Sequence, residues 1–94
     1  MKYKLPKGKR ELLEYLGEPY VIQMIDFKNC VYLDMGKYDI EISGGNRKTL
    51  PFTIYVWEKY PDPKIVETHN KIEHNHCKVK ELLDDIRYRY TKIV

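Results

Sequence analysis

The sequence predicts an α+β fold: an antiparallel four- to five-stranded meander sheet with a short N-terminal helix and a longer C-terminal helix packed on one face. Two patterns support this prediction. In the middle of the chain apolar and polar residues alternate, which is typical of strands with one buried face. Near both ends apolar residues instead recur every three or four positions, as they do on one side of an amphipathic helix.

The first helical pattern is GKRELLEYLGEP, in which Leu12, Leu13 and Leu16 fall on one stripe. Gly17 suits the position that follows a helix C-terminus, and Pro19 prevents the helix from continuing. A helix of two turns is unstable alone, so we expect its apolar stripe to pack on the sheet.

Strand-like patterns follow, and the clearest are residues 38–43 and 52–58, which alternate strictly. Gly36 and Lys37 suit a two-residue hairpin turn, because a type II′ turn prefers glycine first. GGNRKTLP and KYPDP predict the connections before and after residues 52–58, and FKN separates the first two strands. The predicted strands span residues 20–26, 30–35, 38–43, 52–58 and, at the edge, 64–70.

The segment CKVKELLDDIRYRYTKIV predicts the second helix, and Asn75 suits its N-cap. Its apolar stripe consists of Val79, Leu82, Leu83, Ile86 and Tyr90. This stripe can cover the apolar face of the sheet. With 94 residues, no repeat and no linker, the chain predicts a single domain, residues 1–94.

The composition argues against several protein classes. No apolar run approaches the roughly 18 residues of a membrane span, and no apolar stretch follows MKYKLPKGKR as a signal peptide requires. Cys30 and Cys77 are too few for a disulfide framework, so we expect reduced thiols, with a single bridge between them as the alternative. We therefore expect a cytoplasmic protein without a membrane partner.

The charge is concentrated near the start of the sequence. The formal net charge is +3, but the chain beyond residue 10 is slightly acidic, so the pattern predicts a short basic N-terminal arm, residues 1–10. The arm is interpreted either as a solvated terminus or as a nucleic-acid-binding segment. Its basic residues are Lys2, Lys4, Lys7, Lys9 and Arg10.

If both helices cover one face of the sheet, the other face is open. The residues expected on the open face are Tyr32, Asp34, Asp39, Glu41, Tyr55 and Trp57. The hairpin register places Asp34 opposite Asp39, and opposed carboxylates repel each other. We expect a lysine, a basic partner, a cation or a raised pKa to offset this repulsion, unless both aspartates lie in open water, where screening weakens it.

The open face is interpreted as a partner-binding surface. Trp and Tyr commonly anchor protein interfaces, although aromatic residues also fill strands without any binding role. Carboxylates beside them would repel phosphate, so we expect a larger protein or ribonucleoprotein with a basic surface, or a second copy of the chain in a homodimer through the open sheet face.

A metal-dependent enzyme is the alternative interpretation. Its ligands would come from His69, His74, His76 and Cys77, or from Asp34, Asp39 and Glu41. The sequence contains neither the Cys-x-x-Cys nor the His-x-x-x-His spacing of common metal sites. We therefore favour a polar connection between the last strand and the second helix, and expect no catalytic residue, metal or other cofactor.

The block YVIQMIDFKNCVYLDMGKYDIEIS, followed by FTIYVW and an amphipathic helix, resembles a family of small phage-encoded anti-CRISPR proteins that act on type II-A systems. The shared features are an aromatic residue at the strand start, the DMGKYDIEIS hairpin with its alternating acidic residues, and the strand-then-helix finish. The resemblance implies a non-enzymatic inhibitor from a phage or mobile element that blocks an RNA-guided nuclease by direct contact. That family also carries a longer basic arm, for which only residues 1–10 could stand here.

Overall fold

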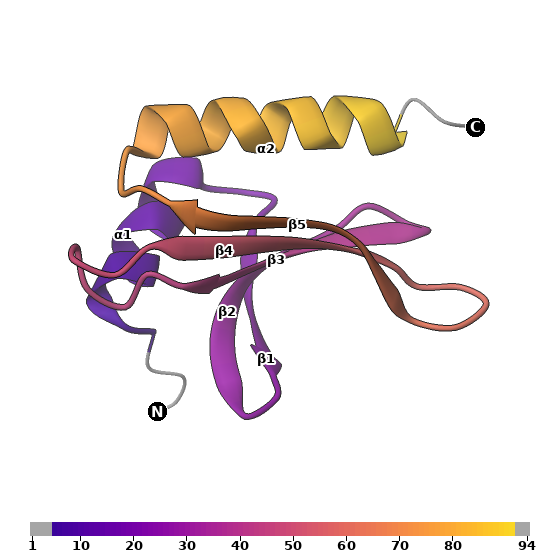
Figure 1. Ribbon diagram of the computed structural model, residues 1–94, viewed down its shortest axis with the longest axis horizontal. Helices are drawn as coiled ribbons and strands as arrows, with labels where there is room; N and C mark the ends of the chain where they lie inside the picture. Colours follow the sequence, from indigo (N-terminus) through magenta and orange to yellow (C-terminus); the bar gives the residue numbers. More distant parts are fainter. Residues whose placement is uncertain (1–4, 92–94) are drawn as a thin grey trace.

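The computed structural model describes residues 5–91 and consists of one five-stranded antiparallel sheet with two helices on one side (Figure 1). The strands follow one another in the order β1-β2-β3-β4-β5, so the predicted α+β fold with a meander sheet is confirmed. No helix within this part of the chain is long and apolar enough to cross a membrane. The elements are α1 (Lys7–Leu16), β1 (Val21–Ile25), β2 (Lys28–Asp34), β3 (Tyr38–Gly44), β4 (Phe52–Glu58), β5 (Lys64–Ile72) and α2 (His76–Thr91).

The core lies between the sheet and the helices, as the alternating pattern predicts. The register pairs Ile40 with Val56 and Ile42 with Ile54, and these four side chains are fully buried. α2 runs along one side of the sheet and covers this apolar face (Figure 1). The helical residues that complete the buried core are Leu12 from α1 and Val79, Leu83 and Ile86 from α2.

The hairpin between β2 and β3 forms as predicted. The backbone N–H of Met35 donates to the carbonyl of Tyr38 over 2.9 Å. Gly36 has a φ of 95°, the positive value that the first turn position requires. The register places Asp34 opposite Asp39, which confirms the predicted pair of opposed carboxylates.

The hairpin between β1 and β2 differs from the prediction, which placed its connection at residues 27–29. The turn consists of Asp26 and Phe27, with φ of 52° and 66°, and β2 already begins at Lys28. Two positive φ values are typical of a type I′ turn, for which sequences usually supply Asn or Gly. Phe rarely adopts this conformation, so the turn could not be predicted from the residue types at these positions. The Phe27 side chain is 96% exposed at the hairpin tip.

The start of the described chain is folded against the sheet. Leu5 is buried, α1 begins at Lys7, and Lys9 is only 3% exposed. The Lys9 ammonium donates a hydrogen bond to the carbonyl of Asn29 over 3.0 Å, and burial lowers the pKa of this lysine. A lysine stem can pack on apolar surface when its charged end finds an acceptor. Residues 7–10 of the predicted basic arm therefore belong to α1, with Lys9 buried and Lys7 and Arg10 exposed.

A polar cluster around Glu67 joins α2 to β5. The Glu67 carboxylate accepts hydrogen bonds from Nη2 of Arg89, at 3.1 Å, and from the hydroxyl of Tyr90. Nε2 of His69, on the same strand, lies 2.9 Å from the carboxylate. These contacts, Arg89 foremost, lower the pKa of Glu67 to about 2.

Glu67→Gln is expected to lower the free energy of unfolding at neutral pH by about 1 to 2 kcal/mol, since it removes charge-assisted hydrogen bonds that are partly open to water. Because the folded-state pKa lies below the ordinary value, this contribution is complete above about pH 4.5 and is lost as the pH falls toward about 2. Urea unfolding at several pH values measures the difference. A difference that stays constant down to about pH 2 would contradict the assignment.

Candidate functional site

Four of the predicted partner-binding residues project together from the face of the sheet opposite the helices. Asp39 pairs with Trp57, and Glu41 pairs with Tyr55, so each pair lies on one side of the sheet. The core residues of β3 and β4 alternate with them and face the helices. Tyr32 pairs with Glu41 from the neighbouring strand β2 and shares the open face.

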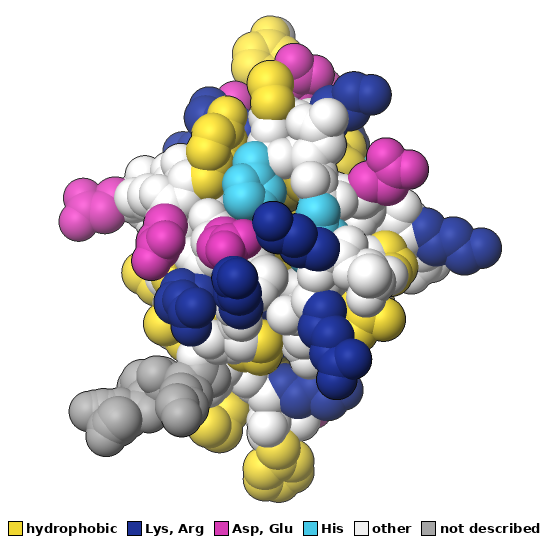
Figure 2. Space-filling model, turned by 90° about the vertical axis from the view of Figure 1, so that its left-hand side faces the viewer, with side chains coloured by type: hydrophobic (Ala, Val, Ile, Leu, Met, Phe, Trp, Pro, Cys, Tyr) yellow, Lys and Arg dark blue, Asp and Glu magenta, His cyan; other side chains and the backbone are white. Residues whose placement is uncertain are grey.

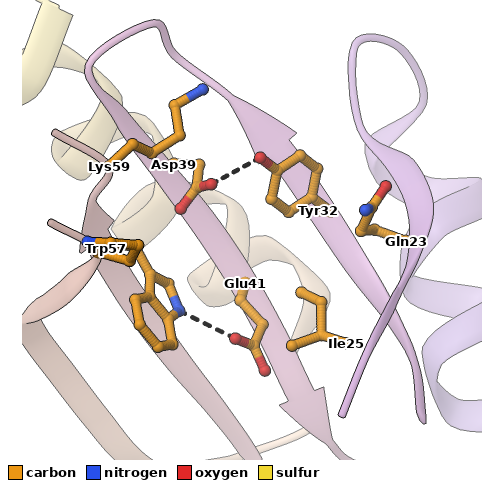
Figure 3. A pocket seen from close by; sticks show the side chains of 8 residues that line it. Gln23, Ile25, Tyr32, Asp39, Glu41, Trp57 and Lys59 are labelled. Carbon is orange, nitrogen blue, oxygen red and sulfur yellow. Dashed lines mark hydrogen bonds between the residues drawn. The ribbon is translucent and has the colours of Figure 1, made fainter. Parts of the chain in front are cut away.

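The open face is hollowed into a pocket of about 310 Å³ (Figure 3). Its floor is formed by β2, β3 and β4, and β1 supplies a wall that carries Gln23 and Ile25. The volume lies at the lower end of the range for small-ligand sites. The lining residues are Gln23, Ile25, Tyr32, Asp39, Glu41, Trp57, Lys59 and Pro63.

Asp39 is a nearly buried carboxylate in this pocket, with 8% of the residue exposed. The hydroxyl of Tyr32 donates to its Oδ2 over 2.6 Å (Figure 3). Its other oxygen, Oδ1, is buried and accepts no hydrogen bond from the residues that the structure describes. Burial raises the pKa of Asp39, against the opposing effects of the Tyr32 hydrogen bond and the charge of Lys59.

Glu41 is the second nearly buried carboxylate, with 6% of the residue exposed. The indole N–H of Trp57 donates to its Oε1 over 2.9 Å (Figure 3), and the thiol of Cys30 lies 3.9 Å from its Oε2. Burial raises the pKa of Glu41, and the bond from Trp57 opposes this shift. Two carboxylates with raised pKa values in one pocket are a frequent mark of a functional site, because burial of charge destabilises a fold.

The repulsion between the opposed carboxylates of Asp34 and Asp39 is offset in a different way at each residue. Asp34 is exposed, and its Oδ1 lies 2.7 Å from the ammonium of Lys59 and accepts the backbone N–H of Gly36 over 2.8 Å. These two contacts lower the pKa of Asp34, with Lys59 as the larger cause. A lysine beside one aspartate and a raised pKa on the other are both among the expected means of offsetting the repulsion. Asp34 does not line the pocket.

Several pocket residues were missed from the sequence. Lys59 follows Trp57 by two positions, so continuing the strand alternation would have placed it on the same face. Gln23 and Ile25 reach the pocket because β1 pairs with β2 along the bent edge of the sheet. The residue pattern within a single strand does not predict how the sheet bends. Tyr55, which was predicted for the site, shares the face but is not part of the pocket lining.

The histidines and Cys77 do not come together. Their partners differ: Glu67 for His69, Phe52 for His74, Tyr15 for His76 and Glu81 for Cys77. Among residues 5–91 no group of three or more His, Cys, Asp or Glu side chains is positioned to hold a metal ion. Both ligand sets considered from the sequence, the histidine set and the carboxylate set, are therefore not assembled.

The histidine-rich segment serves instead as the connection to α2. The side-chain oxygen of Asn75 accepts the backbone N–H of Lys78 over 3.1 Å, which confirms Asn75 as the N-cap. The ring of His74 stacks on Phe52, with centroids 4.3 Å apart. Both cysteines are free thiols, Cys30 buried and Cys77 exposed.

Basic side chains gather at the end of the molecule shown in Figure 2, with histidines among them. A groove of about 270 Å³ between α1 and the β3–β4 connection is lined by Lys7, Arg47 and Lys48, with Glu11 as its acidic member. Of the residues predicted to form the basic arm, Lys7 lies in this groove and Arg10 is exposed. Lys9 is buried, and Lys2 and Lys4 lie outside the described residues.

Comparisons of the chain with protein-family models, with curated proteins and with solved structures find no match.

Proposed function

We propose that this chain is a small non-enzymatic binding protein whose open sheet face docks on a positively charged surface of a larger protein or ribonucleoprotein. The observation that supports this most is the carboxylate of Asp39, which is nearly buried while its Oδ1 has no hydrogen-bond donor among residues 5–91. A cationic group from a partner would supply the missing donor and offset the cost of burying charge. A role in binding a partner, rather than a role in folding, therefore explains why the Asp39 carboxylate is nearly buried.

The surroundings of the pocket favour a protein surface as its partner. Trp57 and Tyr32 orient the two carboxylates and add aromatic area, which is common at the centre of protein interfaces. The two hairpins that flank the sheet carry exposed apolar residues, Phe27 on one and Tyr60 on the other. Nucleic-acid phosphate is the less suitable partner for this face, since buried carboxylates repel it.

The narrower form of the proposal is a phage or mobile-element inhibitor that acts in the cytoplasm on an RNA-guided nuclease. Its support is the resemblance of the strand block and second helix to anti-CRISPR proteins. An acidic and aromatic face also suits docking on a basic nucleic-acid channel, where it would occupy sites meant for phosphate.

Affinity capture from a bacterial lysate, followed by mass spectrometry and a binding assay with the purified partner, tests the proposal. We expect a basic partner whose binding weakens about 10-fold or more in Trp57→Ala and, to a smaller degree, in Tyr55→Ala. Tyr88→Ala, on the opposite layer, is the matched control because Tyr88 is an exposed aromatic of α2. Equal binding by all three variants would exclude the open face as the docking surface, and capture of only a second copy of the chain would replace the heteromeric partner with a homodimer.

A second proposal is nucleic-acid binding by the basic groove beside α1. Lys7, Arg47 and Lys48 line this groove, and contacts from basic residues to phosphate make binding strongly salt-dependent. A gel shift with the double variant Arg47→Glu and Lys48→Glu should lose the complex, whereas Lys37→Glu, at the other end of β3, should retain most of it. Binding that does not change with salt, or no binding, rejects this proposal.

A further inference from the structure

We infer that the pocket on the open sheet face is a receptor for a single arginine side chain of the partner. The inference deepens the proposed function and rests on it. It states which chemical group the pocket selects. It follows from the positions of the two carboxylates, from the hydrogen bonds that one oxygen of each already accepts, and from the aromatic walls of the pocket.

The two carboxylates leave one acceptor each for an incoming group. Oδ2 of Asp39 is bonded to the Tyr32 hydroxyl and Oε1 of Glu41 to the Trp57 indole. Oδ1 of Asp39 has no donor among the described residues, and Oε2 of Glu41 has only the weak thiol donor of Cys30 at 3.9 Å. Both carboxylates line the pocket, but Oδ1 of Asp39 has almost no solvent-exposed surface, so an incoming group bonds to it only when the side chains around it move.

This spacing favours guanidinium over ammonium. Asp39 and Glu41 lie two residues apart on β3, which separates their Cα atoms by about 6 to 7 Å. A guanidinium group carries five N–H donors in a planar fork and can bond to two acceptors at once. A lysine ammonium is a compact point charge that would reach one carboxylate well and the other poorly.

The walls of the pocket suit the same group. Trp57 and Tyr32 flank the carboxylates (Figure 3), and guanidinium stacks on aromatic rings more readily than ammonium does. Their hydrogen bonds hold both carboxylates in place before any ligand enters, which reduces the ordering that binding requires. The volume of about 310 Å³ suits one long side chain.

The pocket's own cation does not fill the site. Lys59 lines the rim, but its ammonium lies 2.7 Å from Asp34, outside the pocket lining. Lys59 therefore does not donate to Oδ1 of Asp39, which has no hydrogen-bond partner in the part of the chain that the structure describes.

The test uses the indole N–H of Trp57 as the reporter in ¹H–¹⁵N correlation spectra, since Trp57 is the single tryptophan of the chain. Nα-acetyl-arginine amide is titrated into the full chain at constant ionic strength. The matched probes are the lysine derivative and the citrulline derivative, which keeps the shape of arginine but has no charge. We expect a saturable shift with arginine at a Kd on the order of 1 to 10 mM, about 5-fold or more weaker binding of lysine, and no saturation with citrulline.

Two variants show whether the carboxylates are responsible. Glu41→Gln and Asp39→Asn should each weaken arginine binding about 5-fold or more, while Asp84→Asn on α2 leaves it unchanged. The spectra themselves report whether each variant is folded, and the two substitutions are independent should one disturb the fold. Citrulline binding as tight as arginine, or no saturable arginine shift, would overturn the inference. If one of these two results is obtained while binding of a captured partner is still weakened by Trp57→Ala, the proposed docking surface stands and only its selectivity for arginine fails.

Discussion

Leu83→Ala is expected to lower the free energy of unfolding by about 3 kcal/mol, the largest stability effect of any substitution considered. Leu83 is fully buried in the core that α2 shares with the sheet. Removing its branched end takes apolar area out of the core and leaves a cavity that the rigid sheet cannot close completely. Urea unfolding monitored by Trp57 fluorescence measures the change.

Leu50→Ala is the matched control for this substitution. Leu50 lies in the β3–β4 connection and is 46% exposed, so the same chemical change removes much less buried surface. We expect its effect to stay below about 1 kcal/mol. Similar losses at the two positions would mean that α2 does not cover the apolar face of the sheet.

Asp39→Asn is expected to weaken binding of the basic partner about 10- to 100-fold without lowering the melting temperature at neutral pH. The substitution removes a charge that burial makes unfavourable, while the amide oxygen can still accept the Tyr32 hydroxyl. Loss of binding at unchanged stability separates a binding residue from a structural one. Calorimetry with the captured partner and thermal unfolding measure the two quantities.

The pH dependence of this variant follows from the raised pKa of Asp39. The folded protein keeps the Asp39 proton to a higher pH than the unfolded chain does. The stability of the wild type therefore falls, relative to the variant, as the pH rises from the ordinary aspartate range through the raised value. The melting temperature of Asp39→Asn could instead drop relative to that of the wild type over this pH rise. That result would contradict the conclusion that the cost of burying the Asp39 charge is not compensated.

The fold could be predicted largely because its local signals agree. The alternation in β3 and β4 sets which side chains face the helices, and the turn at Gly36 sets the register that brings Asp34 opposite Asp39. Because both helices were expected on one face of the sheet, the opposite face was expected to be uncovered. Phe27 shows the limit of local signals, because its positive φ is imposed by the hairpin and not favoured by the residue.

The burial of the two carboxylates could not be predicted from sequence. Residues on an uncovered sheet face are expected to be exposed, yet Asp39 and Glu41 are nearly buried. Their burial depends on β1 and on the rings of Tyr32 and Trp57, which meet only after the whole sheet has formed and bent. Lys9 is the converse case, since its charge suggested a solvated arm while packing of α1 placed it inside.

The most direct test is a pH titration of the side-chain carboxyl carbons of Asp39 and Glu41 by ¹³C NMR, without and with the arginine probe. We expect both pKa values to lie above the ordinary values of 3.8 and 4.5 in the free protein. Saturation with the probe should lower both, because a bound cation favours the charged carboxylates. Values at or below the ordinary ones in the free protein, or values that the probe leaves unchanged, would contradict a buried acidic receptor for a cationic group.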